Sequence, residues 1–485
     1  MLKPIIVGRD EAVTGSAEPS VRCALASLSL SMLLSSLGTS IANVGLPTFA
    51  QAFNASFQEV QWIVLAYLLA ITTLIVSVGR LGDITDRRRL LLAGIFLFTV
   101  ASVLCGVAPT LWLLIAARAA QGLGAAIMMS LAMAFVGETV PKAKTGSAMG
   151  LLGAMSAIGT ALGPSLGGVL IAGPGWRAIF LVNVPLGVLT FVLAYRALPV
   201  DCQKAKTGPK TEPKTERAGF DTMGTLLLAL TLAAYALAMT MGRGSFGPLN
   251  MALLLAAVFG AGLFVRTEAR VASPLIRLAM FRDPSLSASL ATSALVSTVM
   301  MATLVVGPFY LSRALGLDTA LVGIVLSVGP IVVALTGVPA GRIADRFGAQ
   351  RMTVVGLIGI AAGSFMLAML PATLGVPGYI APIVVITVGY ALFQTANNTA
   401  VMTDIRPDQR GVISGMLNLS RNLGLITGAS VMGAVFALAT AATDITTADP
   451  NAVVTGMRVT FTVAGVLIVV ALAIAVGSRA QAPPK

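Results

Sequence analysis

The chain has 485 residues, of which 56% are hydrophobic and only 11% charged, and it contains no histidine. A soluble protein carries about 25% charged residues, so this composition excludes an ordinary soluble enzyme or binding domain. The formal net charge of +13 would suit a nucleic-acid-binding protein, but the positions of the basic residues argue against that interpretation.

Apolar segments long enough to cross a bilayer recur along the whole chain. A helix needs about 20 residues to span the ~30 Å hydrocarbon core, and fourteen segments meet this requirement. We therefore predict an all-α polytopic membrane protein with both termini on one side. The predicted helices cover residues 23–46, 57–80, 90–108, 111–136, 145–172, 178–197, 220–241, 249–267, 286–311, 320–340, 352–371, 379–402, 411–437 and 456–478.

Polar stretches divide these helices into blocks. Residues 198–219 interleave lysines with prolines, a composition typical of a flexible linker. The predicted units are a tail (1–22), an N-terminal six-helix bundle (23–197), that linker (198–219), an extra transmembrane hairpin (220–267), a second linker (268–285), a C-terminal six-helix bundle (286–478) and a second tail (479–485).

Lysine and arginine residues indicate the orientation. Most of the 32 fall in the two tails and in the loops that follow even-numbered helices, whereas the opposite face carries only Arg177, Arg243, Arg313 and Arg458. This bias predicts that both termini lie in the cytosol of a multi-pass cytoplasmic (inner) membrane protein. The expected macromolecular surroundings are therefore the lipid bilayer and no nucleic acid.

An eleven-residue stretch occurs twice, once as Gly79–Arg89 and once as Gly341–Arg351. The two copies share Gly, Arg, Asp and the final Arg at identical offsets, which indicates internal duplication. Two positive-inside loops would explain the arginines but not the paired Gly and Asp. The candidate gate residues are Gly79, Asp83, Arg87, Arg88, Gly341, Asp345 and Arg346.

The two carboxylates of this repeat have predicted partners. Free N–H groups at a helix start stabilise a carboxylate. We expect Asp83 to cap the helix that begins near Gly411, and Asp345 the helix that begins near Gly146, when the cytosolic side is closed.

Several polar side chains lie inside predicted helices. Arg118 is about 10 Å and Arg421 about 15 Å from the nearer helix end at ~1.5 Å per residue, and an arginine at such depth must face protein or water. A snorkelling Arg118 and a purely interhelical asparagine cluster are the alternatives. The candidate substrate or proton pathway residues are Asn43, Arg118, Gln121, Asn397, Asn398, Asn418 and Arg421.

The predicted helix 145–172 is rich in glycine. Glycines at helical spacing allow a second helix to approach closely, and a proline inside the helix favours a kink. Such a helix suits a protein that moves between two states. The residues concerned are Gly159, Gly163, Pro164, Gly167 and Gly168.

Together these motifs resemble those of the fourteen-helix drug:proton antiporters of the major facilitator superfamily, over nearly the whole chain and most closely over residues 35–190. The resemblance implies two pseudo-symmetric six-helix bundles with an inserted hairpin, and multidrug efflux without a cofactor, driven by a proton gradient. It is carried by Gly79–Arg89, by Arg118 with Gln121, Gly122 and Gly124, by the glycines of 145–172 with Pro164, and by Trp176–Gly187.

The sequence departs from that family at several positions. Gly38 stands where members that export cations usually carry Asp, Asp86 stands where Gly is usual, and Ala349 and Gln350 replace the Arg87 and Arg88 of the first repeat. No acidic residue falls in the middle third of a predicted helix. Because an unpaired buried arginine repels a cation, we expect neutral or anionic amphipathic substrates to be favoured over cationic ones.

The expected function is secondary active export of small amphipathic compounds by a monomer, through alternating access. Proton coupling would use a carboxylate near a helix end, such as Glu59, Asp83 or Glu138. The alternatives are an uncoupled or differently coupled metabolite exporter and a membrane sensor or scaffold that does not translocate its ligand. No catalytic constellation and no metal-ligand spacing is present in the sequence, so no enzyme is expected.

Overall fold

The computed structural model describes residues 18–55, 57–198, 221–240, 247–271, 274–403, 405–441 and 449–481. Within these ranges the secondary structure is helical, and 14 segments are long and apolar enough to cross a membrane. The predicted all-α polytopic membrane fold is therefore confirmed. The greater part of the linker predicted at 198–219 lies outside the described residues.

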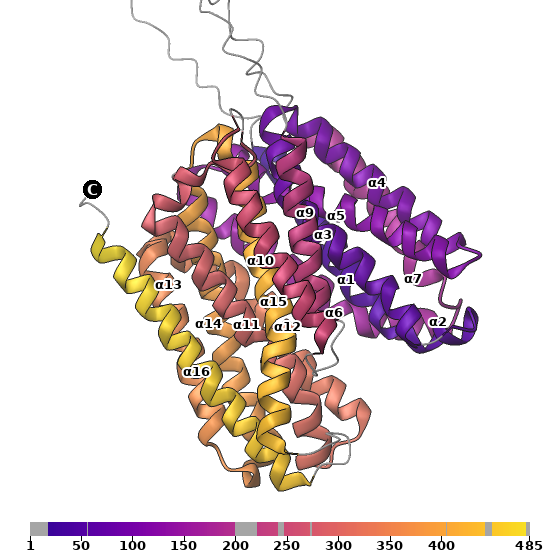
Figure 1. Ribbon diagram of the computed structural model, residues 1–485, viewed down its shortest axis with the longest axis vertical. Helices are drawn as coiled ribbons and strands as arrows, with labels where there is room; N and C mark the ends of the chain where they lie inside the picture. Colours follow the sequence, from indigo (N-terminus) through magenta and orange to yellow (C-terminus); the bar gives the residue numbers. More distant parts are fainter. Residues whose placement is uncertain are drawn as a thin grey trace, which may run out of the picture.

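Two helical bundles lie side by side, the N-terminal one drawn in indigo to magenta and the C-terminal one in orange to yellow (Figure 1). The N-terminal bundle consists of α1 (Glu18–Val44), α2 (Leu46–Ala52), α3 (Phe57–Ile84), α4 (Arg87–Val107), α5 (Leu111–Thr139), α6 (Thr145–Ala172), α7 (Ala178–Leu181) and α8 (Asn183–Ala197). The C-terminal bundle consists of α11 (Pro284–Phe309), α12 (Thr319–Phe347), α13 (Ala349–Met369), α14 (Gly375–Thr403), α15 (Arg410–Thr440) and α16 (Pro450–Gln481).

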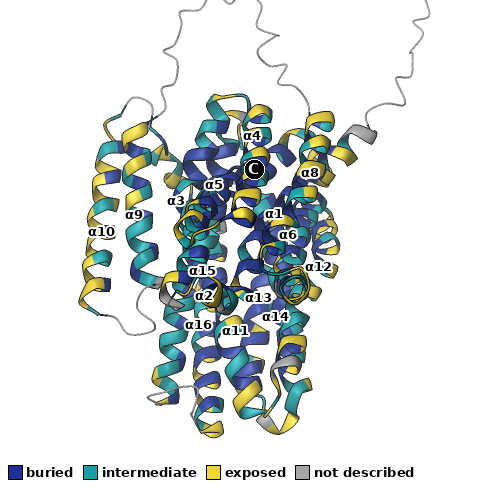
Figure 2. Cartoon of the chain, turned by 90° about the vertical axis from the view of Figure 1, so that its right-hand side faces the viewer, coloured by how far each residue is buried: buried dark blue, intermediate teal, exposed yellow. Residues whose placement is uncertain are grey.

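Burial follows this arrangement. Dark blue buried residues fill the centre of each bundle, and exposed residues lie on the outer faces (Figure 2). The bundles meet along two helix pairs, α6 with α12 and α3 with α15. These four helices form most of the seam, and smaller contacts of α5 with α15 and of α14 with α6 complete it.

The extra hairpin consists of α9 (Thr222–Thr240) and α10 (Pro248–Glu268). It stands at one side of the bundles, with α9 on the inside (Figure 2). Helix α9 contacts both α3 and α15, and the Tyr235 hydroxyl hydrogen-bonds the Thr427 hydroxyl of α15. On α10, Val258 and Phe259 are 71% and 75% exposed, as expected for side chains that face lipid. The hairpin is thus attached through α9, beside the seam.

The duplicated stretch is more helical than we expected. Helix α3 continues to Ile84 and α12 to Phe347, so only Thr85 and Asp86 separate α3 from α4, and only Gly348 separates α12 from α13. Asp86 starts α4 by accepting a hydrogen bond from the Arg89 N–H (3.1 Å), whereas Gly348 has φ +90°, a conformation that favours glycine. The predicted helix ends at residues 80 and 340 were therefore too early. Helices α1 and α16 likewise extend into the predicted tails.

Candidate transport gates and central cavity

The first gate joins α3 to the start of α15. The Asp83 carboxylate accepts hydrogen bonds from the Gly411 N–H (2.8 Å) and the Val412 N–H (2.9 Å), and its side chain is fully buried. A Cβ at Gly79 would overlap the Gly411 carbonyl, so the absence of a side chain lets the two backbones touch. The contact expected between Asp83 and this helix start is present.

Arg87 extends this gate into a charge network. Its guanidinium pairs with Asp83 (2.5 Å) and with Glu138 of α5. Arg410, the first residue of α15, lies against Gly137, where a Cβ would be 3.2 Å from its Nε. Two acidic and two basic side chains therefore gather where α3, α4, α5 and α15 meet.

The second gate joins α12 to the start of α6. The Asp345 carboxylate accepts hydrogen bonds from the Gly146 N–H (2.8 Å), the Ser147 N–H (2.9 Å) and the Ser147 hydroxyl (2.8 Å). A Cβ at Gly341 would overlap the Gly146 carbonyl, as at the first gate. Both gates lie at the same end of the molecule, which we call the basic end because both arginine-rich repeats are there.

Two predicted gate residues lie apart from the gates. Arg88 donates to the Tyr195 carbonyl and its guanidinium carbon is 5.2 Å from the centre of the Tyr195 ring, so it ties α4 to α8. Arg346 is exposed and lies 5.4 Å from the ring centre of Phe347. Neither arginine pairs with a gate carboxylate. Helix geometry explains this, because consecutive side chains of a helix point about 100° apart. Arg88 therefore points away from the side that Arg87 faces, and Arg346 away from the side that Asp345 faces.

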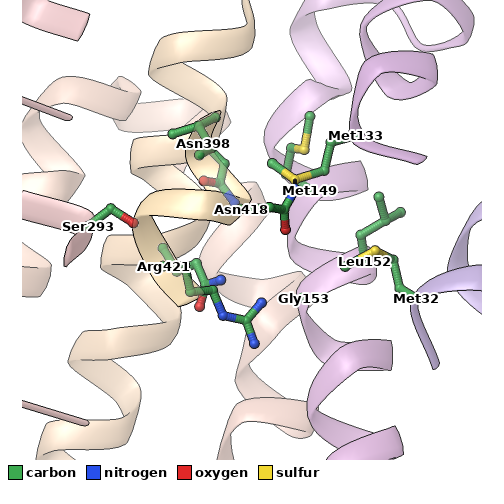
Figure 3. Close-up of a pocket in the computed structure, with 11 residues that line it drawn as sticks. Met32, Met133, Met149, Leu152, Gly153, Ser293, Asn398, Asn418 and Arg421 are labelled. Atoms are coloured by element: carbon green, nitrogen blue, oxygen red, sulfur yellow. Dashed lines mark hydrogen bonds between the residues drawn. The ribbon is translucent and has the colours of Figure 1, made fainter. Parts of the chain in front are cut away.

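A cavity between the bundles has two unlike walls (Figure 3). The N-terminal bundle contributes an apolar wall, in which three methionines provide adaptable, polarisable surface. The C-terminal bundle contributes a polar wall of amides, one hydroxyl and one guanidinium. The residues are Met32, Met133, Met149, Leu152 and Gly153 on the first side, and Ser293, Gln394, Asn398, Leu417, Asn418 and Arg421 on the second.

Arg421 carries the positive charge of this cavity. Its guanidinium points toward the space beside Gly153 (Figure 3), and its Nε is buried without a hydrogen-bond partner. Among the described residues it forms no ion pair with an aspartate or glutamate. The Asn418 amide nitrogen donates to the Ser414 carbonyl (3.0 Å) and to the Met133 sulfur (3.2 Å), and no described residue donates to its amide oxygen. The cavity thus combines apolar surface with an unneutralised cation.

The cavity is narrow in this conformation, with a volume of about 20 Å³. Hydrogen bonds cross the seam at the two gates, between the Ser414 hydroxyl and the Ser130 carbonyl (2.5 Å), and in the cavity itself, where the Asn418 amide donates to the Met133 sulfur (3.2 Å). An amphipathic molecule would have to move the bundles apart to occupy the cavity.

Arg118 lies elsewhere, fully buried inside the N-terminal bundle. It donates to the carbonyls of Ile63 (3.0 Å) and Gly38 (3.0 Å) and to the Gln121 side chain (2.5 Å), and it lies 4.1 Å from the Tyr67 ring centre. These partners are all neutral. Because they lie on α1, α3 and α5, Arg118 joins these three helices. A Cβ at Gly38 would be 2.9 Å from the Tyr67 hydroxyl, so Tyr67 fills the space beside Gly38.

The remaining predicted pathway residues separate. Asn398 faces the central cavity, but Asn397 points into the C-terminal bundle and donates to the Ser289 carbonyl (3.3 Å). Asn43 is exposed near the end of α1. The sequence analysis missed Met32, Met133 and Met149, because a methionine in a membrane helix looks the same whether it faces lipid, protein or a cavity.

Three of the four predicted α6 glycines lie on the face that packs against α1. A Cβ at Gly159 or Gly163 would overlap α1, and one at Gly167 would be 3.2 Å from Ile41, whereas one at Gly168 would meet nothing within 4 Å. Gly168 is therefore not part of the predicted packing face. Helix α6 is continuous through position 164.

Comparisons with known proteins agree with this arrangement. The sequence profile of the Major Facilitator Superfamily matches residues 28–429. The multidrug resistance protein Stp of Mycobacterium tuberculosis is 32% identical over 420 residues, which cover 84% of this chain and 74% of Stp. The riboflavin transporter RibZ of Clostridioides difficile is 28% identical over 408 residues, which cover 84% of this chain and 86% of RibZ.

Among solved structures, the proton:xylose symporter XylE shares the fold, with a TM-score of 0.67 at 14% identity over 96% of this chain and 97% of XylE. The predicted family resemblance is thus confirmed. The chain belongs to the major facilitator superfamily of membrane transporters.

Proposed function

We propose that this protein exports small amphipathic compounds across a bacterial cytoplasmic membrane by alternating access. The basic end would face the cytosol, as the positive-inside rule requires, so the two gates close the cytosolic side. Export is favoured by the likeness to Stp, whose name describes multidrug resistance. Rocking of the two bundles about the central cavity would expose it to each side in turn.

The proposed substrate class is inferred from Arg421, which has no acidic partner among the described residues. A cation entering the cavity would approach a poorly solvated guanidinium, whereas an anion would gain a charge-assisted hydrogen bond. The three methionines on the facing wall supply surface for an apolar body. Neutral and anionic amphiphiles would therefore be preferred over cationic ones.

Proton coupling would act at the first gate. Protonation of Asp83 or Glu138 would remove a negative charge that Arg87 and the N-terminus of α15 stabilise, and the cap would weaken. The proton gradient would then favour opening of the basic end. Glu59 is exposed, and it belongs to neither the gate network nor the central cavity.

Transport in proteoliposomes tests this proposal. The substrates should be an anionic and a cationic amphiphile that share one apolar body, measured by counterflow and then under an imposed pH gradient. Wild-type protein should prefer the anion. Arg421→Gln should lower anion transport by roughly 10- to 100-fold, as expected for loss of one charge-assisted bond of about 1.5–3 kcal/mol. Robust cation transport that Arg421→Gln leaves unchanged would contradict the assigned substrate class.

A metabolite exporter without tight proton coupling is the second candidate. No acidic residue lines the central cavity among the described residues, and RibZ is named as a riboflavin transporter. In that case counterflow would be normal while an imposed pH gradient would drive no accumulation. Absence of counterflow for every compound, with binding retained, would instead favour a sensor or scaffold.

A further inference from the structure

A second cavity lies within the C-terminal bundle at its basic end, apart from the central cavity. It has a volume of about 290 Å³ and is formed by the ends of α11, α13, α14 and α16. We call it the corner cavity. It is lined by Ser285, Ala288, Ser289, Thr292, Gln350, Arg351, Thr353, Asn397, Ala400, Ala475 and Ser478.

Arg351 is the charged residue of the corner cavity, and the internal repeat explains why it is unpaired. Its counterpart in the first repeat, Arg89, pairs with Asp86 through Nε (3.2 Å). The position of Asp86 in the second repeat is occupied by Gly348. No described acidic residue forms an ion pair with Arg351, so its guanidinium is available to a ligand.

The repeat also explains why the corner is hollow. Two residues after Arg89 the first repeat has Leu91, which is fully buried in an apolar core. Two residues after Arg351 the second repeat has Thr353, which lines the corner cavity. One residue before them, Arg88 contacts Tyr195 on α8, whereas its counterpart Gln350 lines the cavity. The same corner is therefore filled in one bundle and open in the other.

The lining offers one cation and several oxygen acceptors. The hydroxyls of Thr353, Thr292 and Ser478 donate to backbone carbonyls (3.0, 3.2 and 3.1 Å), which leaves their lone pairs free to accept. Asn397 is only 2% exposed and donates to the Ser289 carbonyl, and its side-chain oxygen is likewise free. A ligand that fits must carry an anion for Arg351 and hydroxyl donors for the oxygens.

We propose that the corner cavity binds the headgroup of an anionic glycerophospholipid such as phosphatidylglycerol. This headgroup is a phosphate ester with free hydroxyls. The cavity lies at the ends of membrane helices, where headgroups are found. The lining helices also carry exposed apolar residues, Val355 on α13 and Val476 on α16, at 48% and 49%. An acyl chain can lie on these residues, whereas a free phosphate would not use them.

Native mass spectrometry of the delipidated, full-length protein tests this site. The probes are phosphatidylglycerol, phosphatidylcholine with the same acyl chains, and inorganic phosphate. Wild-type protein should retain phosphatidylglycerol at least about tenfold better than phosphatidylcholine, because the choline headgroup keeps the phosphate but adds a cation that Arg351 repels and has no hydroxyl to donate. Arg351→Gln should weaken retention of phosphatidylglycerol and narrow this preference, because the repulsion of the choline cation is lost together with the contact to the phosphate. Thr353→Leu should also weaken binding, because it fills the cavity without changing charge.

The repeat provides a matched control. Arg89→Gln removes the same charge from the exposed, paired position of the first repeat and should leave lipid retention unchanged. Equal losses in Arg89→Gln and Arg351→Gln, or equal retention of the two lipids by wild-type protein, would overturn the proposal. Full displacement of the lipid by inorganic phosphate would overturn the lipid assignment in favour of a soluble anion. Correct folding of each variant is checked by its elution as a single species, and the test needs no transport activity.

Discussion

The two gates use the same contact but neutralise their carboxylates differently. Asp83 and Asp345 each accept hydrogen bonds from two backbone N–H groups at a helix start. Asp83 also pairs with Arg87, which in turn pairs with Glu138. At the second gate Ala349 replaces Arg87, and the additional donor to Asp345 is the Ser147 hydroxyl.

This difference assigns different sensitivities to the gates. The first gate depends on a network of charges. A proton added to Asp83 or Glu138 changes the net charge of this network and weakens the contact that closes the gate. The second depends on hydrogen bonds to one carboxylate, with no described arginine or lysine paired to it. Duplication therefore preserved the backbone geometry of closure while charge control was kept at one gate.

Blocking the shared backbone contact should give the largest effect, and it should be equal at both gates. Leucine at Gly79 would overlap the Gly411 carbonyl, and leucine at Gly341 would overlap the Gly146 carbonyl. Gly79→Leu and Gly341→Leu should each abolish uphill uptake into inverted vesicles while the protein still inserts in the membrane. Gly168→Leu, at a position with open space, is the control and should transport normally.

Removing one carboxylate charge should separate the gates. Asp83→Asn loses the ion pair with Arg87, which stays paired with Glu138, so efflux should fall by roughly 10- to 100-fold, from a loss of about 1.5–3 kcal/mol. Asp345→Asn keeps a side-chain oxygen acceptor and has no ion pair to lose, so efflux should fall by less than about tenfold. Initial efflux rates, normalised to the amount of membrane-inserted protein, give the comparison. Equal losses would mean that Arg87 adds nothing to closure.

The backbone pairing of the gates was predictable, whereas the distribution of charge around them was not. Repetition of Gly and Asp at fixed offsets specified which helix starts Asp83 and Asp345 would meet, because duplicated elements occupy equivalent places. The contact of Arg87 with Glu138 joins residues of different helices at unrelated offsets, and no periodicity reports it. Depth along a helix likewise placed Arg118 and Arg421 well inside the membrane-spanning helices, but which of them faces the central cavity depends on helix rotation.

Exchanging one hydroxyl between the gates should give the smallest effect. Ser147→Ala removes one of three donors to Asp345, and a hydrogen bond to a charged group contributes about 1.5–3 kcal/mol, an upper bound here because water can replace the hydroxyl. The closed population at the second gate should therefore fall by several fold, since about 1.4 kcal/mol corresponds to tenfold.

The equivalent residue at the first gate is Val412, whose N–H donates to the Asp83 carboxylate. Val412→Ser should add a donor to Asp83 and shift the population toward the closed state. Distances between spin labels placed across the basic end report both changes, and a Val412→Ser protein that opens more readily would contradict the role given to the hydroxyl.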